Sequence, residues 1–294
     1  MDDRFVIAGI RPAEKPPAPK KRMSLRGKPL SSLLFLGAVL LGCLCCELFL
    51  TKDPAYMDLA HCSVPPGGEF LFGTDAMGRD IFSMIWYGGR ISLFVGFASA
   101  LISAAAAILI GTVSGLAPRW LDGLLMRLTE IFLSVPGLLL ILLVQAVLGK
   151  ATVLSLSVVI GLTGWTSIAK VVRMEVRQLR TSEYVAAARC MGGGALHILR
   201  KHLLPNFFPS ILFMVVMNVR NAVVTEATRS FLGIGLPLEI ISWGSMLSLS
   251  EKALTAGAWW MILIPGVFLV GTLLCLTNLG NFLRRTVSRR ERNL

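Results

Sequence analysis

Long apolar runs alternate with short polar stretches along this chain of 294 residues. Each run is about 20 residues long, which is the length that a helix needs to cross the hydrocarbon core of a bilayer. Only helices satisfy their own backbone hydrogen bonds in lipid, apart from closed barrels. The pattern therefore predicts an all-α polytopic membrane protein with six transmembrane helices, at Leu33–Leu50, Ile91–Leu116, Leu125–Leu148, Val153–Val172, Phe207–Ala227 and Trp259–Phe282.

The composition and the placement of charge agree with a membrane protein. The chain is 54% hydrophobic and 16% charged, whereas a soluble domain carries about 25% charged residues. If the six spans alternate in direction, 22 of the 29 Lys and Arg residues fall on one side. The positive-inside rule then places both termini in the cytoplasm. Because the net charge of +12 lies beside the apolar runs, we expect membrane lipid, and not nucleic acid, as the partner of these charges.

The polar segments divide the chain into regions. Residues 1–30 are rich in Lys, Arg and Pro, which predicts a disordered basic cytoplasmic tail. Residues 31–50 form the first anchor, and we interpret it as uncleaved because its apolar character continues past Cys43. Residues 51–89 are predicted to be an extracytoplasmic loop, 90–283 a five-helix core, and 284–294 a second basic cytoplasmic tail. Within the core, residues 228–257 are an outer segment that could partly re-enter the membrane.

Two local signals occur inside the spans. Pro136 is able to kink the third span, because proline removes a backbone donor and clashes with the preceding turn. Gly111 and Gly115 have the small-xxx-small spacing that permits close approach of two helices.

The stretch from Glu183 to Asn206 is polar and basic, and it predicts a cytoplasmic hairpin at residues 183–204. Gly192, Gly193 and Gly194 separate two short helices, and Glu183 suits the N-terminus of the first. Leu196, Leu199 and Leu203 share one face of the second by the helical period. Pro205 is expected to end that helix and to start the next one. The hairpin either docks into another protein or is a solvated loop without a partner.

No enzymatic chemistry is visible in the sequence. The nearest match to a phosphate-binding loop, at residues 73–80, lacks the Lys that reaches phosphate. We therefore expect no catalytic residue, no metal site and no cofactor in this chain. If the protein moves a solute, a partner supplies the energy.

Charged residues near the outer face have two interpretations each. Glu226, near the outer end of the fifth span, could line a translocation path or pair with Arg229 or Arg220. Asp75, Arg79 and Asp80 could hold the outer loop together by ion pairs or dock an external binding protein.

Four ordered blocks of sequence resemble the type I ABC importer permeases, specifically the second permease subunit of the dipeptide, oligopeptide and nickel group. The blocks are similar to the family's outer-loop motif, its coupling-loop motif, the SFLGLG…SWGxML pair and the C-terminal motif. In this chain they are Phe72–Asp80, Glu183–Gly192 with Lys201–Asn206, Ser230–Gly235 with Ser242–Leu247, and Asn278–Gly280 with Leu283 and Arg284.

The resemblance implies a type I permease fold with cytoplasmic coupling helices, in a permease that moves di- or oligopeptides by alternating access. It implies four kinds of partner: a homologous second permease, two ABC ATPase subunits that bind ATP and Mg, an extracytoplasmic solute-binding protein and membrane lipid. The residues implied in coupling to the ATPases are Glu183, Ala186, Ala187, Gly192, Leu199, Leu203 and Pro205, although Ala186 stands where the family motif has its named carboxylate. The same signature covers nickel or metal-chelate importers, and a non-transporting scaffold or sensor subunit is the alternative of another class.

Overall fold

The computed structural model describes residues 29–291, apart from 51, 238, 251–252 and 254–256. The predicted tail at 1–30 therefore lies almost wholly outside the described residues, as do 292–294. The described residues form helices and one isolated β-bridge, between Thr74 and Asp80. The elements are α1 (Leu30–Leu44), α2 (Cys46–Phe49), a 3₁₀ turn (Leu59–His61), α3 (Ile81–Leu116), α4 (Arg119–Ser134), α5 (Gly137–Leu148), α6 (Val153–Gly164), α7 (Thr166–Arg180), α8 (Glu183–Cys190), α9 (Ala195–Ile198), a π-helical turn (Leu199–Leu203), α10 (Leu204–Phe231), α11 (Trp243–Leu249) and α12 (Trp260–Glu291).

The all-helical architecture is confirmed, but a count of six single spans is not. Among the described residues, α3, α10 and α12 are long and apolar enough to cross a membrane, and two bent helix pairs raise the number to five. The first predicted span is the shorter apolar helix α1, of 15 residues. Two predicted boundaries were wrong: α3 begins at Ile81, inside the predicted loop 51–89, and α12 continues through 284–291, where we expected a tail.

Both bent pairs replace a span that the sequence predicts as continuous. The predicted third span corresponds to α4 and α5, which meet at 97° across Pro136. Proline breaks the hydrogen-bond ladder there, so the predicted kink is confirmed and is larger than a simple bend. The predicted fourth span corresponds to α6 and α7, which meet at 45° around Trp165.

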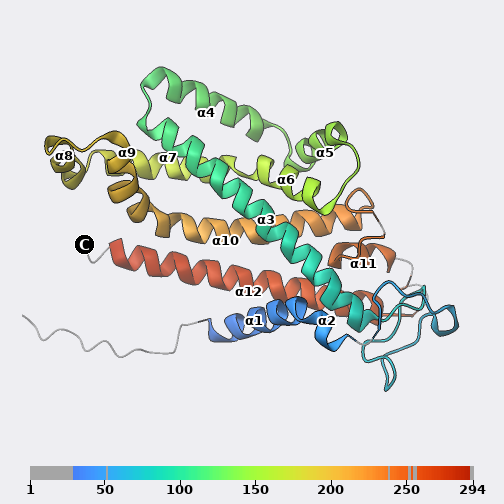
Figure 1. Ribbon diagram of the computed structural model, residues 1–294. Helices are drawn as coiled ribbons and strands as arrows, with labels where there is room; N and C mark the ends of the chain where they lie inside the picture. The colour runs from blue at the N-terminus through green and yellow to red at the C-terminus, as the bar shows by residue number, and fades with distance from the viewer. Residues whose placement is uncertain (1–28, 51, 238, 251–252, 254–256, 292–294) are drawn as a thin grey trace, which may run out of the picture.

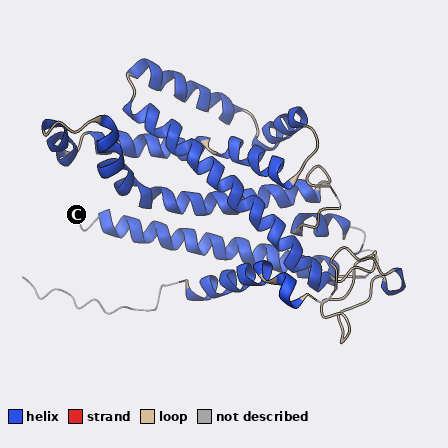
Figure 2. Ribbon diagram, viewed as in Figure 1, coloured by secondary structure: helices blue, strands red, loops and turns tan. Residues whose placement is uncertain are grey.

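The long helices run side by side, with the connecting segments gathered at their two ends (Figures 1 and 2). Helix α10 packs against both α3 and α12, and α3 also packs against α6 and α7. The hairpin α8–α9 lies at one end, together with the C-terminal end of α12 and the start of α1 (left in Figure 1). Residues 52–80 and α11 lie at the other end.

Helices α3 and α7 approach closely at two glycines. A Cβ atom added to Gly111 would lie 2.7 Å from the carbonyl oxygen of Ala169, and one added to Gly115 would lie 2.7 Å from Val176 Cγ1. Contacts this short leave no room for a side chain. The small-xxx-small spacing on α3 is therefore used for helix packing.

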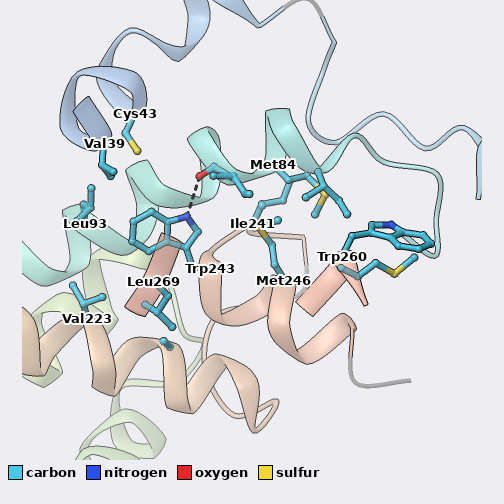
Figure 3. Packing of buried hydrophobic residues seen from close by; sticks show 14 of the residues in the cluster. Val39, Cys43, Met84, Leu93, Val223, Ile241, Trp243, Met246, Trp260 and Leu269 are labelled. Atoms are coloured by element: carbon cyan, nitrogen blue, oxygen red, sulfur yellow. Dashed lines mark hydrogen bonds between the residues drawn. The ribbon is translucent and has the colours of Figure 1, made fainter. Parts of the chain in front are cut away.

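Trp243, the first residue of α11, is the centre of the largest apolar cluster (Figure 3). Its side chain is fully buried, and its indole Nε1 donates a hydrogen bond of 3.0 Å to the carbonyl oxygen of Ile85 on α3. The cluster includes Val39 of α1, Val223 of α10 and Leu269 of α12. One indole ring therefore joins elements from both halves of the chain at the end opposite the hairpin.

Candidate functional site

The predicted hairpin at residues 183–204 is present as two helices joined by glycines. Helix α8 begins at Glu183, and α9 begins at Ala195, directly after the three glycines. Gly192 adopts a φ of +83°, in the left-handed region that a side chain disfavours. A Cβ on Gly193 would lie 2.7 Å from the carbonyl oxygen of Ala188. Glycine is therefore favoured at Gly192 by the positive φ and at Gly193 by the close carbonyl oxygen.

The second arm of the hairpin does not end before Pro205, which corrects the prediction. Helix α9 passes through the π-helical turn Leu199–Leu203 directly into α10, where Pro205 occupies the first turn. The backbone N–H of Leu204 donates to the carbonyl oxygen of Leu199, five residues earlier. Pro205 lacks an N–H and cannot donate a hydrogen bond to the preceding turn. We attribute the continuity of the helix to the wider π-helical turn, which changes the hydrogen-bond pattern just before Pro205. The second arm of the hairpin is thus continuous with α10, while α8 is joined to it through the glycine turn.

The inner face of the hairpin is buried within the chain itself. Leu203 is 1% exposed and packs in a cluster with Val185, Ile198 and Phe207, while Leu199 is half-buried against the same cluster. Of these two residues, which the resemblance implies in coupling, Leu203 is therefore covered by the chain itself and Leu199 is partly exposed. The helical period identified the shared face correctly, but α7 and α10 of this chain cover it.

The outer face of α8 is exposed and carries small or apolar side chains. Glu183, Ala186 and Ala187 are exposed, as are Tyr184 at 41% and Met191 at 81%. Tyr184 and Ala187 are three residues apart and share one face of α8, and Met191 follows directly after the end of the helix. We define the outer face as Tyr184, Ala187 and Met191.

An ion-pair cluster fixes the helix that precedes the hairpin. Asp122 of α4 is buried and accepts hydrogen bonds from Arg173 and Arg177 of α7 and from Ser114 of α3. The Arg173 contact is bidentate, with Nη2 at 2.7 Å from Oδ2, which adds geometric specificity to the charge attraction. Sequence reasoning missed this cluster, because its members lie 51 and 55 residues apart.

A cavity of about 510 Å³ lies between the two helix breaks and α10. Its walls include Pro136 and Gly137 from the α4–α5 break, Gly164 and Thr166 from the α6–α7 break, and Asn218 from α10. The volume lies within the range of small-ligand pockets. One feature of this cavity was visible in the sequence, the kink at Pro136. The other walls are remote in the chain, so sequence reasoning did not assemble them.

Glu226 is fully buried, and it does not line this cavity. Its carboxylate accepts hydrogen bonds of 2.9 Å from the hydroxyls of Ser92 and Ser230. The predicted pairing with Arg229 or Arg220 is absent among the ion pairs of the described residues. The pairing interpretation is therefore not realised: the carboxylate joins α3 to α10 beside Trp243, whose backbone N–H donates to Ser92 Oγ. A role of Glu226 in a translocation path stays a prediction.

The outer-loop charges are structural. The Asp75 carboxylate forms a buried ion pair with Arg79, with Nη2 at 2.6 Å, and it also accepts the backbone N–H of Arg79. Asp80 caps the N-terminus of α3 by accepting from the backbone N–H and hydroxyl of Ser83. The ion-pair interpretation is confirmed for Asp75 and Arg79. All three residues are less than one tenth exposed, so their burial does not favour the alternative interpretation that they dock a binding protein.

The fold and these sites describe a helical membrane protein with an exposed hairpin at one end and a cavity along its length. Residues 107–293 match the family described as binding-protein-dependent transport system inner membrane component. The chain belongs to this family, and the sequence-based assignment to the ABC importer permeases is confirmed.

Relatives and a solved structure agree with this family. The chain is 34% identical to the oligopeptide transport system permease protein OppC of Bacillus subtilis over 86% of this chain and 82% of that protein. It is 33% identical to the dipeptide transport system permease protein DppC of the same organism, over 90% and 81% of the two chains. A chain of the MetNI methionine ABC transporter, in an inward-facing conformation, matches 70% of this chain and 97% of its own length with a TM-score of 0.55 at 18% identity. The last similarity concerns the fold.

Proposed function

We propose that this chain is the transmembrane permease subunit of an ATP-driven importer of di- or oligopeptides. The similarity to permease proteins named for oligopeptide and dipeptide transport supports peptides as the solute. In this proposal the chain catalyses no reaction and binds no cofactor. Two ABC ATPase subunits bind ATP and Mg, a homologous permease completes the pathway, and an extracytoplasmic binding protein delivers the peptide.

The single observation that carries the proposal is the helical continuity of α9 with α10, with α8 packed in the same cluster as both. The outer face of α8 is available to an ATPase subunit as a helix-in-groove contact, while the inner face is packed against α7 and α10. A displacement of the hairpin would therefore move α10, which forms one wall of the cavity. Such coupling is what alternating access requires of a permease without its own nucleotide site.

The membrane topology is part of the same proposal. We infer that α1, α3, the pair α4–α5, the pair α6–α7, α10 and α12 are six spans, with the hairpin and both termini in the cytoplasm. The hairpin, the C-terminal end of α12 and the start of α1 lie together at one end of the bundle (Figure 1), which supports this arrangement. Residues 52–80 would then face the binding protein.

The test is a large, charged substitution on the exposed surface of the hairpin. Ala187→Arg adds bulk and charge to the outer face of α8, so we expect at least a tenfold loss of peptide-stimulated ATP hydrolysis in the complex with both ATPases, because the groove contact is blocked. Thr286→Arg is the matched control, since Thr286 is exposed on α12 toward the same end, and it should hydrolyse ATP as the wild type does.

Two results would contradict the proposal. Full stimulation in the Ala187→Arg complex would exclude the hairpin as the coupling site and would favour a non-transporting scaffold or sensor. Uptake of nickel or a metal chelate, without uptake of labelled peptide, by wild-type complex in liposomes would exclude peptide as the solute.

A further inference from the structure

The cavity between the helix breaks is lined by polar groups that carry no charge. Its polar side chains are hydroxyls from α6 and α7 and amides and a hydroxyl from α10: Thr163, Thr166, Ser167, Asn218, Asn221 and Thr225. Amide and hydroxyl groups both donate and accept hydrogen bonds. This is the chemistry that complements the N–H and C=O groups of a peptide main chain.

The wall formed by α10 has two zones along one helix face. Asn218, Asn221 and Thr225 follow the i, i+3, i+7 spacing, so they share one side of the helix. Met214 and Met217 continue the cavity wall toward the hairpin. Methionine side chains are flexible and adapt to surfaces of different shape. A polar zone is thus followed by an apolar zone that tolerates side chains of varied size.

The polar zone has unused hydrogen-bonding capacity. Within the described part of the chain, the amide of Asn218 has no hydrogen-bond partner, and it lies against Gly164 at the α6–α7 break. The Asn221 Oδ1 atom accepts from Arg220 at 2.8 Å, which leaves the Asn221 NH₂ group as a donor. Thr225 Oγ1 donates to the carbonyl oxygen of Asn221, so its oxygen remains an acceptor. A polar group in a low-dielectric region gains most from a partner that completes such bonds.

We propose that this cavity binds the main chain of the transported peptide, with Asn218, Asn221 and Thr225 as the residues that recognise it. The inference rests on the proposed function and adds the position and chemistry of the peptide site. Neutral main-chain recognition accepts peptides of many sequences, because it makes no demand on side-chain charge. The lining offers amides, hydroxyls and two thioethers, whereas a nickel ion favours imidazole and other stronger ligands.

The two helix breaks give the site a means of release. The 97° bend of α4–α5 and the 45° bend of α6–α7 both form walls of the cavity. A change in either bend angle moves a wall relative to Asn218 on α10. Opening and closing therefore change the spacing of the main-chain contacts without unfolding a helix.

The test compares a peptide with an analogue that is N-methylated on its backbone and keeps every side chain. Wild-type complex with both permeases, both ATPases and the binding protein is placed in liposomes, and uptake of each peptide is divided by its occupancy of the binding protein. We expect Asn218→Leu and Thr225→Val to reduce the preference for the unmodified peptide about fivefold, the equivalent of one hydrogen bond.

The control is Thr277→Val, because Thr277 of α12 makes the same backward hydroxyl bond to a helix carbonyl outside the cavity. It should keep the wild-type preference. If Asn218→Leu fails to assemble, Asn218→Ser and Thr225→Val decide the question. A wild-type preference in the cavity variants would overturn the peptide site, while the importer itself would stand. Wild-type complex that imports neither peptide would overturn the proposed function.

Discussion

The close contact between α3 and α7 predicts that a glycine-to-alanine substitution lowers stability at Gly111 but not at Gly266. A methyl group on Gly111 would lie 2.7 Å from both the carbonyl oxygen of Ala169 and the Cβ of Val172. Neither atom belongs to a flexible side-chain end, so Gly111→Ala must separate the helices. Overpacking costs about 1–3 kcal/mol, which outweighs a gain in helix propensity of up to about 1 kcal/mol. At Gly266 in α12 nothing lies within 4 Å of the added methyl, so only the gain in helix propensity remains.

The measurement is the thermal midpoint of the purified complex. For chains of this size, each kcal/mol shifts the midpoint by about 2–4 °C, so Gly111→Ala should lower it by several degrees and Gly266→Ala should leave it unchanged or raise it. Since α7 leads into the hairpin, Gly111→Ala should also weaken peptide-stimulated ATP hydrolysis. An unchanged midpoint for Gly111→Ala would refute the inference that glycine is required at this interface.

Three further predictions concern the polar and aromatic contacts. Asp122→Asn should lower stability by about 2 kcal/mol, because it removes the charge from buried hydrogen bonds to two arginines; Glu130→Gln, in an exposed pair, should change the thermal midpoint little. Trp243→Phe should lower the free energy of unfolding by about 1–3 kcal/mol, because it removes a buried hydrogen bond and part of the ring. Chemical denaturation measures this change. The hydrogen bond from His61 lowers the pKa of the Asp58 carboxyl from its ordinary 3.8. This contact therefore stabilises the outer loop above pH 3.8, and the stabilisation is lost as the pH falls through the lowered pKa. The protease resistance of the loop should differ between wild type and Asp58→Ala at pH 6, and the two proteins should converge in acid.

Much of the fold follows from local sequence. Run length identified the apolar helices, Pro136 marked a break, and Gly192–Gly194 marked the turn of the hairpin, because each is a property of a few neighbouring residues. Run length could not show that Gly164 and Trp165 interrupt a second span, since neither residue forbids a helix. The start of α3 was also missed, because Asp80 acts as an N-cap only through its contact with Ser83.

The sites depended more on distant neighbours. Helical periodicity placed Leu199 and Leu203 on one face, but it could not say that the chain itself covers Leu203. Glu226 is held by Ser92, 134 residues away in the sequence. The cavity combines residues from five helices, α4, α5, α6, α7 and α10. Such sites arise from tertiary packing, so a pattern read along one segment does not reveal them.

The continuity of α9 with α10 connects the two ends of the bundle through one helix. Helix α10 has 28 residues, and at 1.5 Å per residue it is about 42 Å long. If α10 turns as a rigid body about its first turn, a rotation of about 10° displaces its last turn sideways by about 7 Å. The length of this helix therefore enlarges a small rotation at one end of the bundle into a larger displacement at the other.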